Sequence, residues 1–282
     1  MATTTRRQQP RTPVAARGET ITSRDNRWLK LFRAALRDGY LAEECLIGIE
    51  GPHLVEEAAR SGLTFEALLT STSDESAARG LSADMAGSPR LLRTTARLFE
   101  SVAATEHPQG IAALVRPRES TFDDLLRGAP PLVVVLAGVQ DPGNVGTIAR
   151  SAEAFGASGL LAAKGTADPW SAKALRASAG SALRLPIVRG ISPAVAMVQL
   201  RVSGLRIVAA SSRASAGETP INLRAPCAIF VGNEGGGLSR EIETSADEIF
   251  TIPMSGGVES LNAGVAASVI LYEAARQRAA RV

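Results

Sequence analysis

The chain has 282 residues, 45% of them hydrophobic, a formal net charge of +3 and a pI near 9.2. It contains no apolar run long enough to span a bilayer and no signal-peptide core, so we expect a cytoplasmic protein with no membrane partner. The only cysteines and histidines are Cys45, Cys227, His53 and His107, too scattered to indicate a disulfide framework, a metal site or a histidine-activated nucleophile. The excess of arginine suits a nucleic-acid partner, and it equally suits an ordinary arginine-rich surface.

The first half of the chain predicts a tail, a small domain and a linker. Residues 1–20 carry four arginines before the first acid, Glu19, which is typical of a disordered basic arm. Helix patterns over 23–39 and 52–62 alternate with strand patterns over 44–51, 64–71 and 110–116, which predicts an α/β domain over residues 21–116. Residues 117–131 end in a proline pair and are predicted to be a linker.

The second half, residues 132–282, predicts a larger α/β domain. Strand patterns lie near 132–138, 158–162, 205–210, 226–231 and 248–252. Helix patterns lie near 144–156, 171–180, 192–202, 239–246 and 258–280. This alternation favours a parallel sheet that helices cover on both faces.

Three glycine-rich junctions follow predicted strands of this domain. They are GVQDPGNVGTIAR (138–150), IFVGNEGGGLSREI (229–242) and FTIPMSGGVESLN (250–262). Ligands of open parallel sheets bind outside the carboxyl ends of the strands, so the three loops are expected to converge on one pocket. None of them fits the dinucleotide or P-loop phosphate patterns. Arg150 falls in the first turns of a helix, where its charge opposes the helix dipole, which indicates an anionic ligand.

The three junctions resemble the signature motifs of the SpoU (TrmH) family of the SPOUT superfamily, whose members are RNA ribose 2′-O-methyltransferases. The matching patterns are N-x-G-x-x-x-R from Asn144, G-N-E-G-x-G-L-S from Gly232 and I-P-M-x-G-x-V-E-S-L-N from Ile252. This resemblance implies a trefoil-knotted α/β domain that takes S-adenosylmethionine as its cofactor. The N-terminal pattern E-G-x-x-L-V-E-E-A, from Glu50, resembles the L30e-like domain that binds RNA in this family.

The resemblance assigns roles to individual residues. It implies catalytic or site-building roles for Arg150, Asn144, Glu234, Ser260 and Asn262, and cofactor contacts for Gly232, Ile252, Met254, Gly256 and Leu261. A guanidinium stays protonated, so we expect Arg150 to bind an RNA phosphate and stabilise developing alkoxide instead of acting as a base. Glu234 is expected to fix Arg150 or the loop around it.

Some roles stay open between a functional and a structural interpretation. Asn144 either holds the first loop or caps the helix after it, and Ser260 either faces the ligands or caps the final helix. We expect Arg150 to contact the RNA. Three further basic residues either contact the RNA backbone as well or form a solvated helix face: Lys173, Arg176 and Arg184. The apolar segment LNAGVAASVILYEAA is either a dimer helix of the knot region, as the resemblance implies, or a core helix of a monomer.

The resemblance leads to a functional expectation with alternatives. We expect methyl transfer to a ribose 2′-hydroxyl of structured RNA, with large-subunit ribosomal RNA favoured by the two-domain layout. The alternatives are a tRNA ribose methyltransferase and a non-catalytic RNA-binding or ribosome-assembly protein that retains the fold. The motif trio argues against modification of a base.

Overall fold

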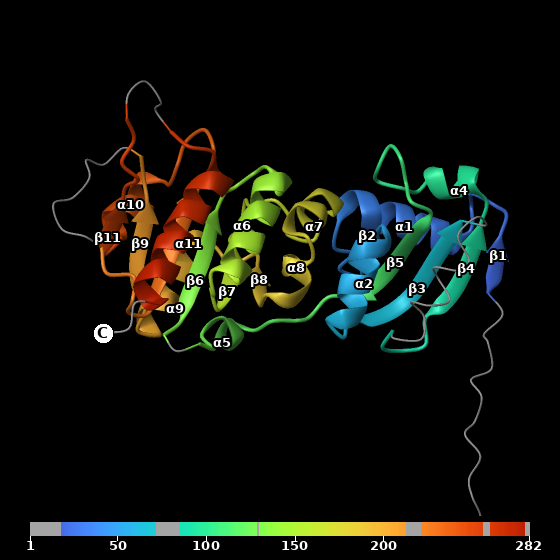
Figure 1. The fold of residues 1–282 in the computed structure, drawn as a ribbon, viewed down its shortest axis with the longest axis horizontal. Coiled ribbons are helices and arrows are strands. Elements are labelled where there is room, and N and C mark those ends of the chain that lie inside the picture. Colours follow the sequence, from blue (N-terminus) through green and yellow to red (C-terminus); the bar gives the residue numbers. More distant parts are fainter. Residues whose placement is uncertain (1–17, 72–84, 129, 213–220, 256–259, 280–282) are drawn as a thin grey trace, which may run out of the picture.

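The protein forms two α/β units joined by an extended connection (Figure 1). The structure, a computed structural model, describes residues 18–71, 85–128, 130–212, 221–255 and 260–279. Most of the predicted basic arm lies outside these residues, although Glu19 and Thr20 belong to an ordered strand.

The N-terminal unit is a five-stranded mixed sheet with helices on both faces. Its elements are β1 (Glu19–Ile21), α1 (Arg27–Asp38), β2 (Ile47–Glu50), α2 (Pro52–Arg60), β3 (Thr64–Ser71), β4 (Arg90–Thr94), α4 (Ala96–Glu100) and β5 (Ile111–Arg116). The strand order is β1-β4-β3-β5-β2, and β5 runs antiparallel to β2 and β3. Phe32 of α1 and Phe99 of α4 pack into one face, and Val55 of α2 packs into the other.

The second unit is a six-stranded, all-parallel sheet, as the alternating pattern predicted. Its strands are β6 (Leu132–Ala137), β7 (Gly159–Ala162), β8 (Ile187–Arg189), β9 (Arg206–Ala210), β10 (Cys227–Gly232) and β11 (Glu248–Phe250), in the order β11-β9-β10-β6-β7-β8. Its helices are α6 (Pro142–Ala154), α7 (Ala172–Ser178), α8 (Ser181–Arg184), α9 (Pro193–Val202), α10 (Arg240–Ser245) and α11 (Ala263–Ala279). Side chains of α6, α7 and α11 fill the core on one face, and those of α9 fill the core on the other. The expected trefoil knot involves the C-terminal segment, part of which (256–259) lies outside the described residues.

Helix starts in the second unit correct two expectations. Helix α6 begins at Pro142, two residues before the predicted start, because Asp141 caps it by accepting a hydrogen bond from the Gly143 amide. Asn144 therefore lies inside the helix and is not its cap. Helix α11 begins at Ala263 and not near 258, because Asn262 accepts hydrogen bonds from the amides of Gly264 and Val265, which leaves Ser260 outside the helix.

The connection between the two units contains an additional helix. Helix α5 (Phe122–Leu125) is closed by a capping box between Thr121 and Asp124, and Leu125 is fully buried against the second sheet. Residues 122–125 of the predicted linker are therefore packed structure. In the second unit the sequence patterns also missed the short strand β8 and the short helix α8.

The end of α11 is tied to the beginning of the second sheet. The Arg278 guanidinium donates to the carbonyl oxygens of Pro130 at 2.7 Å, Ala225 at 3.1 Å and Leu223 at 2.8 Å.

Among the described residues no helix has the length and apolar character that crossing a membrane requires.

Candidate active site

A cavity of about 340 Å³ opens at the carboxyl ends of β9, β10 and β11. Its volume is within the range of small-molecule sites. Six of the residues predicted from the sequence line it: Gly232, Glu234, Ile252, Met254, Ser260 and Leu261. The second and third glycine-rich junctions therefore converge on one pocket, whereas the first junction, expected to join them, contributes no residue to its lining. The predicted contact Gly256 lies outside the described residues.

The second junction is a tight hairpin that Asn233 organises. The Asn233 side chain accepts hydrogen bonds from the amides of Gly235 and Gly236 and donates to the Gly138 carbonyl of the first junction. Gly232 lies so close to the return strand of this hairpin that a Cβ built on it would be 2.2 Å from the Gly237 carbonyl carbon. Close backbone approach, not a left-handed conformation, is thus what requires glycine here.

Glu234 joins the second junction to the first. Its carboxylate accepts hydrogen bonds from the Asn144 side chain at 2.9 Å and from the backbone amides of Gln140 and Asp141, both at 3.2 Å. Partial burial works to raise the pKa of Glu234, but these hydrogen bonds outweigh it and hold the pKa below its ordinary value. We expected Glu234 to fix either Arg150 or the loop around it. The structure shows the second alternative, because Glu234 binds the loop and not the Arg150 guanidinium.

We expect Glu234→Gln to destabilise the protein at neutral pH but much less in acid. Glutamine places an N–H₂ group where the carboxylate accepts backbone N–H bonds, a loss of about 1 kcal/mol, or about 2–4 °C in Tm. Because the pKa of Glu234 is lower in the folded protein, its ionised carboxylate stabilises the folded state at pH values above the ordinary glutamate pKa of 4.5. This stabilisation is lost as the pH falls through the folded-state pKa. The Tm difference from wild type, measured by thermal unfolding, should therefore shrink below pH 4.5.

The control for this prediction is Glu43→Gln, which neutralises an exposed carboxylate far from the junctions. It should change Tm little at any pH. A Tm difference for Glu234→Gln that stays constant down to pH 3 would show that the clamp does not depend on the carboxylate charge.

The third junction meets the first through the start of α11. A Cβ built on Gly264 would be 3.3 Å from Asn144 Oδ1 and 3.2 Å from Asn262 Oδ1 and Thr147 Cγ2, so the two asparagines flank the same glycine. The Ser151 and Ser268 hydroxyls, 2.6 Å apart, extend this contact between α6 and α11. Asn144 is therefore bound by the second junction and lies beside the start of α11, which follows the third.

The glycine of the first motif serves helix packing. A Cβ on Gly146 would be 2.2 Å from the Ala174 carbonyl oxygen and 2.7 Å from the Ala177 Cβ. Helix α7 consequently crosses α6 at a distance that only glycine permits, which brings Lys173 next to the first junction. The Lys173 ammonium pairs with the Asp141 carboxylate at 2.6 Å, and this contact, together with the Gly143 amide, lowers the pKa of Asp141.

Arg150 is an exposed residue of α6 and does not line the cavity. Its guanidinium makes no hydrogen bond or ion pair with any other residue that the structure describes. It lies one turn after Thr147, on the helix face that approaches Gly264. The structure thus presents an unpaired cation beside the junction of α6 and α11.

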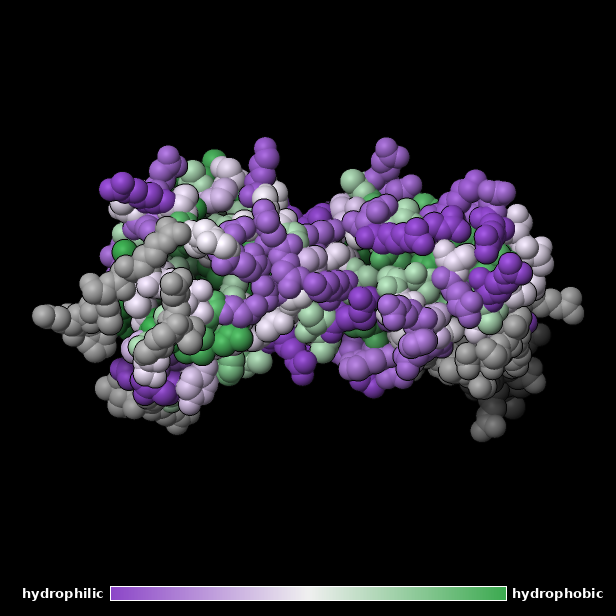
Figure 2. All heavy atoms as spheres, turned by 90° about the horizontal axis from the view of Figure 1, so that it is seen from above, coloured by the Kyte–Doolittle hydropathy of each residue, from purple (hydrophilic) through white to green (hydrophobic). Residues whose placement is uncertain are grey.

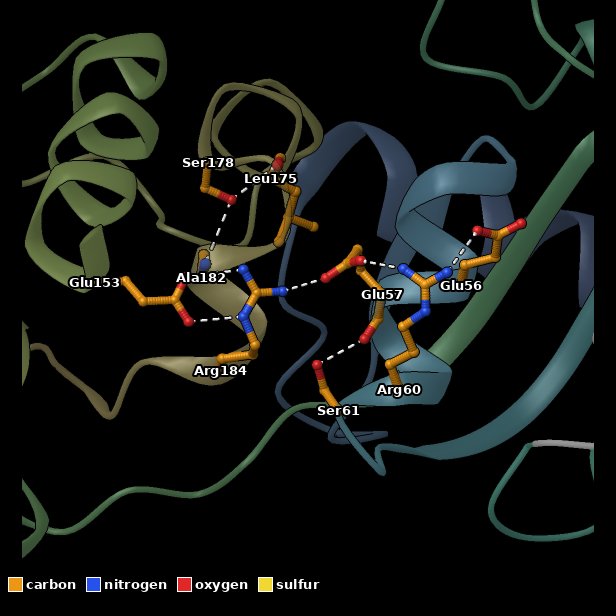
Figure 3. Close-up of polar contacts among 9 residues, drawn as sticks. All are labelled: Glu56, Glu57, Arg60, Ser61, Glu153, Leu175, Ser178, Ala182 and Arg184. Atoms are coloured by element: carbon orange, nitrogen blue, oxygen red, sulfur yellow. Dashed lines mark hydrogen bonds and ion pairs between the residues drawn. The ribbon is translucent and has the colours of Figure 1, made fainter.

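The other predicted RNA contacts differ from one another. Arg176 is exposed, whereas Arg184 donates two hydrogen bonds to Glu153, at 2.6 and 2.8 Å, and a third to Glu57 of the N-terminal unit (Figure 3). Hydrogen bonding to Glu153 raises the pKa of Arg184 and lowers that of Glu153. We therefore correct the assignment of Arg184: its guanidinium serves contacts within the protein.

Three polar residues of the site were missed from the sequence. Asn233 was quoted in the motif without a role, and Ser211 and Glu243 line the cavity and share a hydrogen bond of 2.8 Å. Ser211 follows the end of β9 and Glu243 lies on α10, so the parallel-sheet rule could have indicated Ser211, but no motif marks either residue. In the described part of the chain no group of three or more His, Cys, Asp or Glu residues could hold a metal ion.

Comparison with known proteins places the chain in a family. Residues 131–272 match the SpoU rRNA Methylase family, and residues 42–113 match the MRM3-like substrate binding domain. The chain belongs to the SpoU family of RNA methyltransferases, and a substrate-binding domain precedes its methyltransferase domain.

One curated relative and two solved structures illustrate this similarity. An uncharacterized tRNA/rRNA methyltransferase of Mycolicibacterium vanbaalenii is 36% identical over 237 residues, covering 81% of this chain and 76% of that protein. The SpoU methyltransferase AviRb from Streptomyces viridochromogenes, solved with AdoMet, is 30% identical with a TM-score of 0.81, covering 91% of this chain and all of that one. A structure described as an RNA 2′-O ribose methyltransferase is 31% identical with a TM-score of 0.77, covering 92% and 99%.

Proposed function

We propose that the protein transfers a methyl group from S-adenosylmethionine to a ribose 2′-hydroxyl of folded RNA, with ribosomal RNA as the substrate. The observation that carries this proposal is the cavity that the second and third junctions share and that Glu234 links to α6. Support for the ribose as the target comes from the similarity to the RNA 2′-O ribose methyltransferase, and support for ribosomal RNA comes from the family description.

The cavity fits the proposed cofactor in size and chemistry. Val231, Ile252 and Ile270 provide apolar walls for an adenine ring, and the hairpin after Gly232 offers backbone groups at close range. Glu243 and Ser211 add hydrogen-bonding groups at the wall made by α10 and β9. When bound, S-adenosylmethionine supplies an activated methyl group on a sulfonium, so the protein has mainly to orient the acceptor.

Arg150 and its neighbours are proposed to orient the RNA. Arg150 lies six residues after Asn144, about 9 Å along the helix axis, and the partner of Asn144, Glu234, lines the cavity. From there the Arg150 guanidinium can bind the phosphate beside the target ribose and stabilise negative charge that develops on the 2′-oxygen. Lys173 and Arg176 on α7 extend the basic surface along the RNA backbone.

The test is a comparison of RNA from cells with and without the gene. Mapping of 2′-O-methyl marks should reveal at least one ribosomal nucleotide that carries the mark only when the gene is present. Purified protein with S-adenosylmethionine should restore that mark on RNA from the deletion strain and should leave a DNA copy unmodified, because DNA lacks the 2′-hydroxyl. A gene-dependent methyl group found on tRNA would contradict ribosomal RNA as the substrate. A gene-dependent methyl group found on a base would contradict the ribose as the target.

We also propose that the protein is a homodimer through the face of α11 that points away from its own core. Val265, Val269 and Tyr272 repeat at helical spacing on this face and are 49%, 40% and 56% exposed. Exposed apolar side chains arranged on one helix face are typical of an interface.

Val269→Asp is expected to convert the dimer to a monomer. A charge buried in an apolar interface should weaken dimerisation by about 100-fold or more, measured by light scattering against the chain mass of 29.3 kDa. The comparison variant is Val198→Asp on α9, on the other side of the sheet, where Val195, Val198 and Val202 form a second exposed apolar face; loss of the dimer in this variant instead would place the interface on α9. This variant should leave the mass unchanged, and a wild-type mass of one chain would contradict the dimer.

A further inference from the structure

The boundary between the two units is built from specific polar contacts. Hydrophilic side chains gather along this boundary when the molecule is seen from above (Figure 2). Arg184 of α8 lies at its centre, with Glu57 of α2 on one side and Glu153 of α6 on the other (Figure 3). Glu57 also accepts a hydrogen bond from Arg60 of its own helix at 2.9 Å. In the row Glu153, Arg184, Glu57 and Arg60, each charged group therefore has an opposite charge beside it.

A second contact fixes the boundary on the side of α7. The Tyr40 amide of the N-terminal unit donates to Asp168 at 2.9 Å, and Arg189 donates to the other oxygen of that carboxylate at 3.2 Å. The Arg189 guanidinium also lies over the rings of Tyr40 and Trp170, at 4.3 Å from each centroid. Arg189 of β8 and Asp168 of the segment before α7 therefore hold Tyr40, which follows α1, across the boundary.

The connection between the units is anchored as well. The Arg118 guanidinium donates to the Ser61 carbonyl at the end of α2, and a few residues later Leu125 is buried against the second sheet. The connection thus leaves little freedom for one unit to turn relative to the other.

From these contacts, and resting on the proposed function, we propose that Arg184 is a positioning residue that sets the distance between the RNA held by the N-terminal unit and the nucleotide presented to Arg150. Glu153 and Arg150 lie one turn apart on α6, so the same helix carries the end of the interdomain contact and the proposed RNA-orienting cation. Such a protein selects folded RNA in which the recognised element and the target nucleotide have a fixed separation. A fragment carrying only the target nucleotide would gain nothing from the N-terminal unit.

The test compares full-length variants on two forms of one RNA. Total RNA from cells lacking the gene is either refolded with Mg²⁺ or fragmented to short pieces before methyl transfer is measured. Wild type is expected to show a kcat/KM at least about tenfold higher on refolded RNA, because both units engage it. Glu57→Gln should lower kcat/KM on refolded RNA by about tenfold while the rate on fragments and the affinity for S-adenosylmethionine stay unchanged.

Controls separate positioning from simple loss of structure. Glu56→Gln changes the neighbouring carboxylate, which pairs with Arg60 and not with Arg184, and should match wild type on both RNAs. Arg184→Lys keeps one charge but loses the forked geometry, so its activity should fall between those of wild type and Glu57→Gln. Equal losses on both RNAs, or no loss on either, for Glu57→Gln would overturn the positioning role. Methylation of neither RNA by wild type would instead overturn the proposed function, and this inference with it.

Discussion

Arg150→Ala should lower kcat for RNA methylation by about 1,000-fold, the upper end of what removal of one charge-stabilising donor costs. The side chain is exposed and forms no ion pair with the described residues, so its removal leaves no buried group unsatisfied. It also does not line the cavity, so the affinity for S-adenosylmethionine, measured by calorimetry, should remain within about twofold of wild type.

Two further variants make this result specific. Arg150→Lys retains the charge but not the planar fork, and should recover only part of the lost rate. Arg240→Ala removes another exposed arginine, at the start of α10, and should leave kcat unchanged. Wild-type turnover by Arg150→Ala, or a large loss of cofactor affinity, would show that Arg150 does not have the role proposed for it.

Gly232→Ala should weaken cofactor binding by at least about 30-fold while most of the fold survives. The new methyl group would overlap the backbone of the facing strand, 2.2 Å from the Gly237 carbonyl carbon and 2.3 Å from the Leu238 nitrogen. Backbone cannot rotate away as a side chain can, so the hairpin must open. Strain of about 2 kcal/mol corresponds to a loss in affinity of at least about 30-fold.

The same hairpin provides the matched control. A Cβ on Gly236 would meet no atom within 4 Å, so Gly236→Ala should bind S-adenosylmethionine nearly as wild type does. Circular dichroism of both variants should show unchanged helix content. Equal affinities for the two alanine variants would mean that the close approach at Gly232 does not shape the cavity.

The sequence was sufficient for the regular part of the fold. Long apolar strands such as β6 and the helices with clear start signals were predicted within a few residues, because burial and capping act locally. Short elements were missed for the opposite reason: β1, β4 and β8 have three to five residues, and their strand character comes from their pairing with neighbouring strands. The capping box of α5 is a local signal, but the proline pair that follows it dominated the prediction of a linker.

The site was only partly predictable. The family motifs indicated Gly232, Ile252, Met254 and Leu261, all of which line the cavity. The hydrogen-bond and ion-pair partners of the site residues were harder to predict than the residues themselves, because a partner depends on the tertiary structure. Glu234 was expected to fix Arg150 or the loop around it, and it binds the loop amides and Asn144. Arg184 was expected to face RNA but binds two carboxylates. No spacing along the chain indicates that residues 57 and 184 meet.

The strand order of the second sheet also constrains how the chain is made. Strand β10 lies between β9 and β6, and Cys227 pairs with Leu132, so the central pair of strands joins segments roughly 100 residues apart. At translation rates of about 5–20 residues per second, β6 waits several seconds on the ribosome with one edge unpaired. Such an edge invites association with other nascent chains. A chaperone that shields this edge should therefore raise the soluble yield.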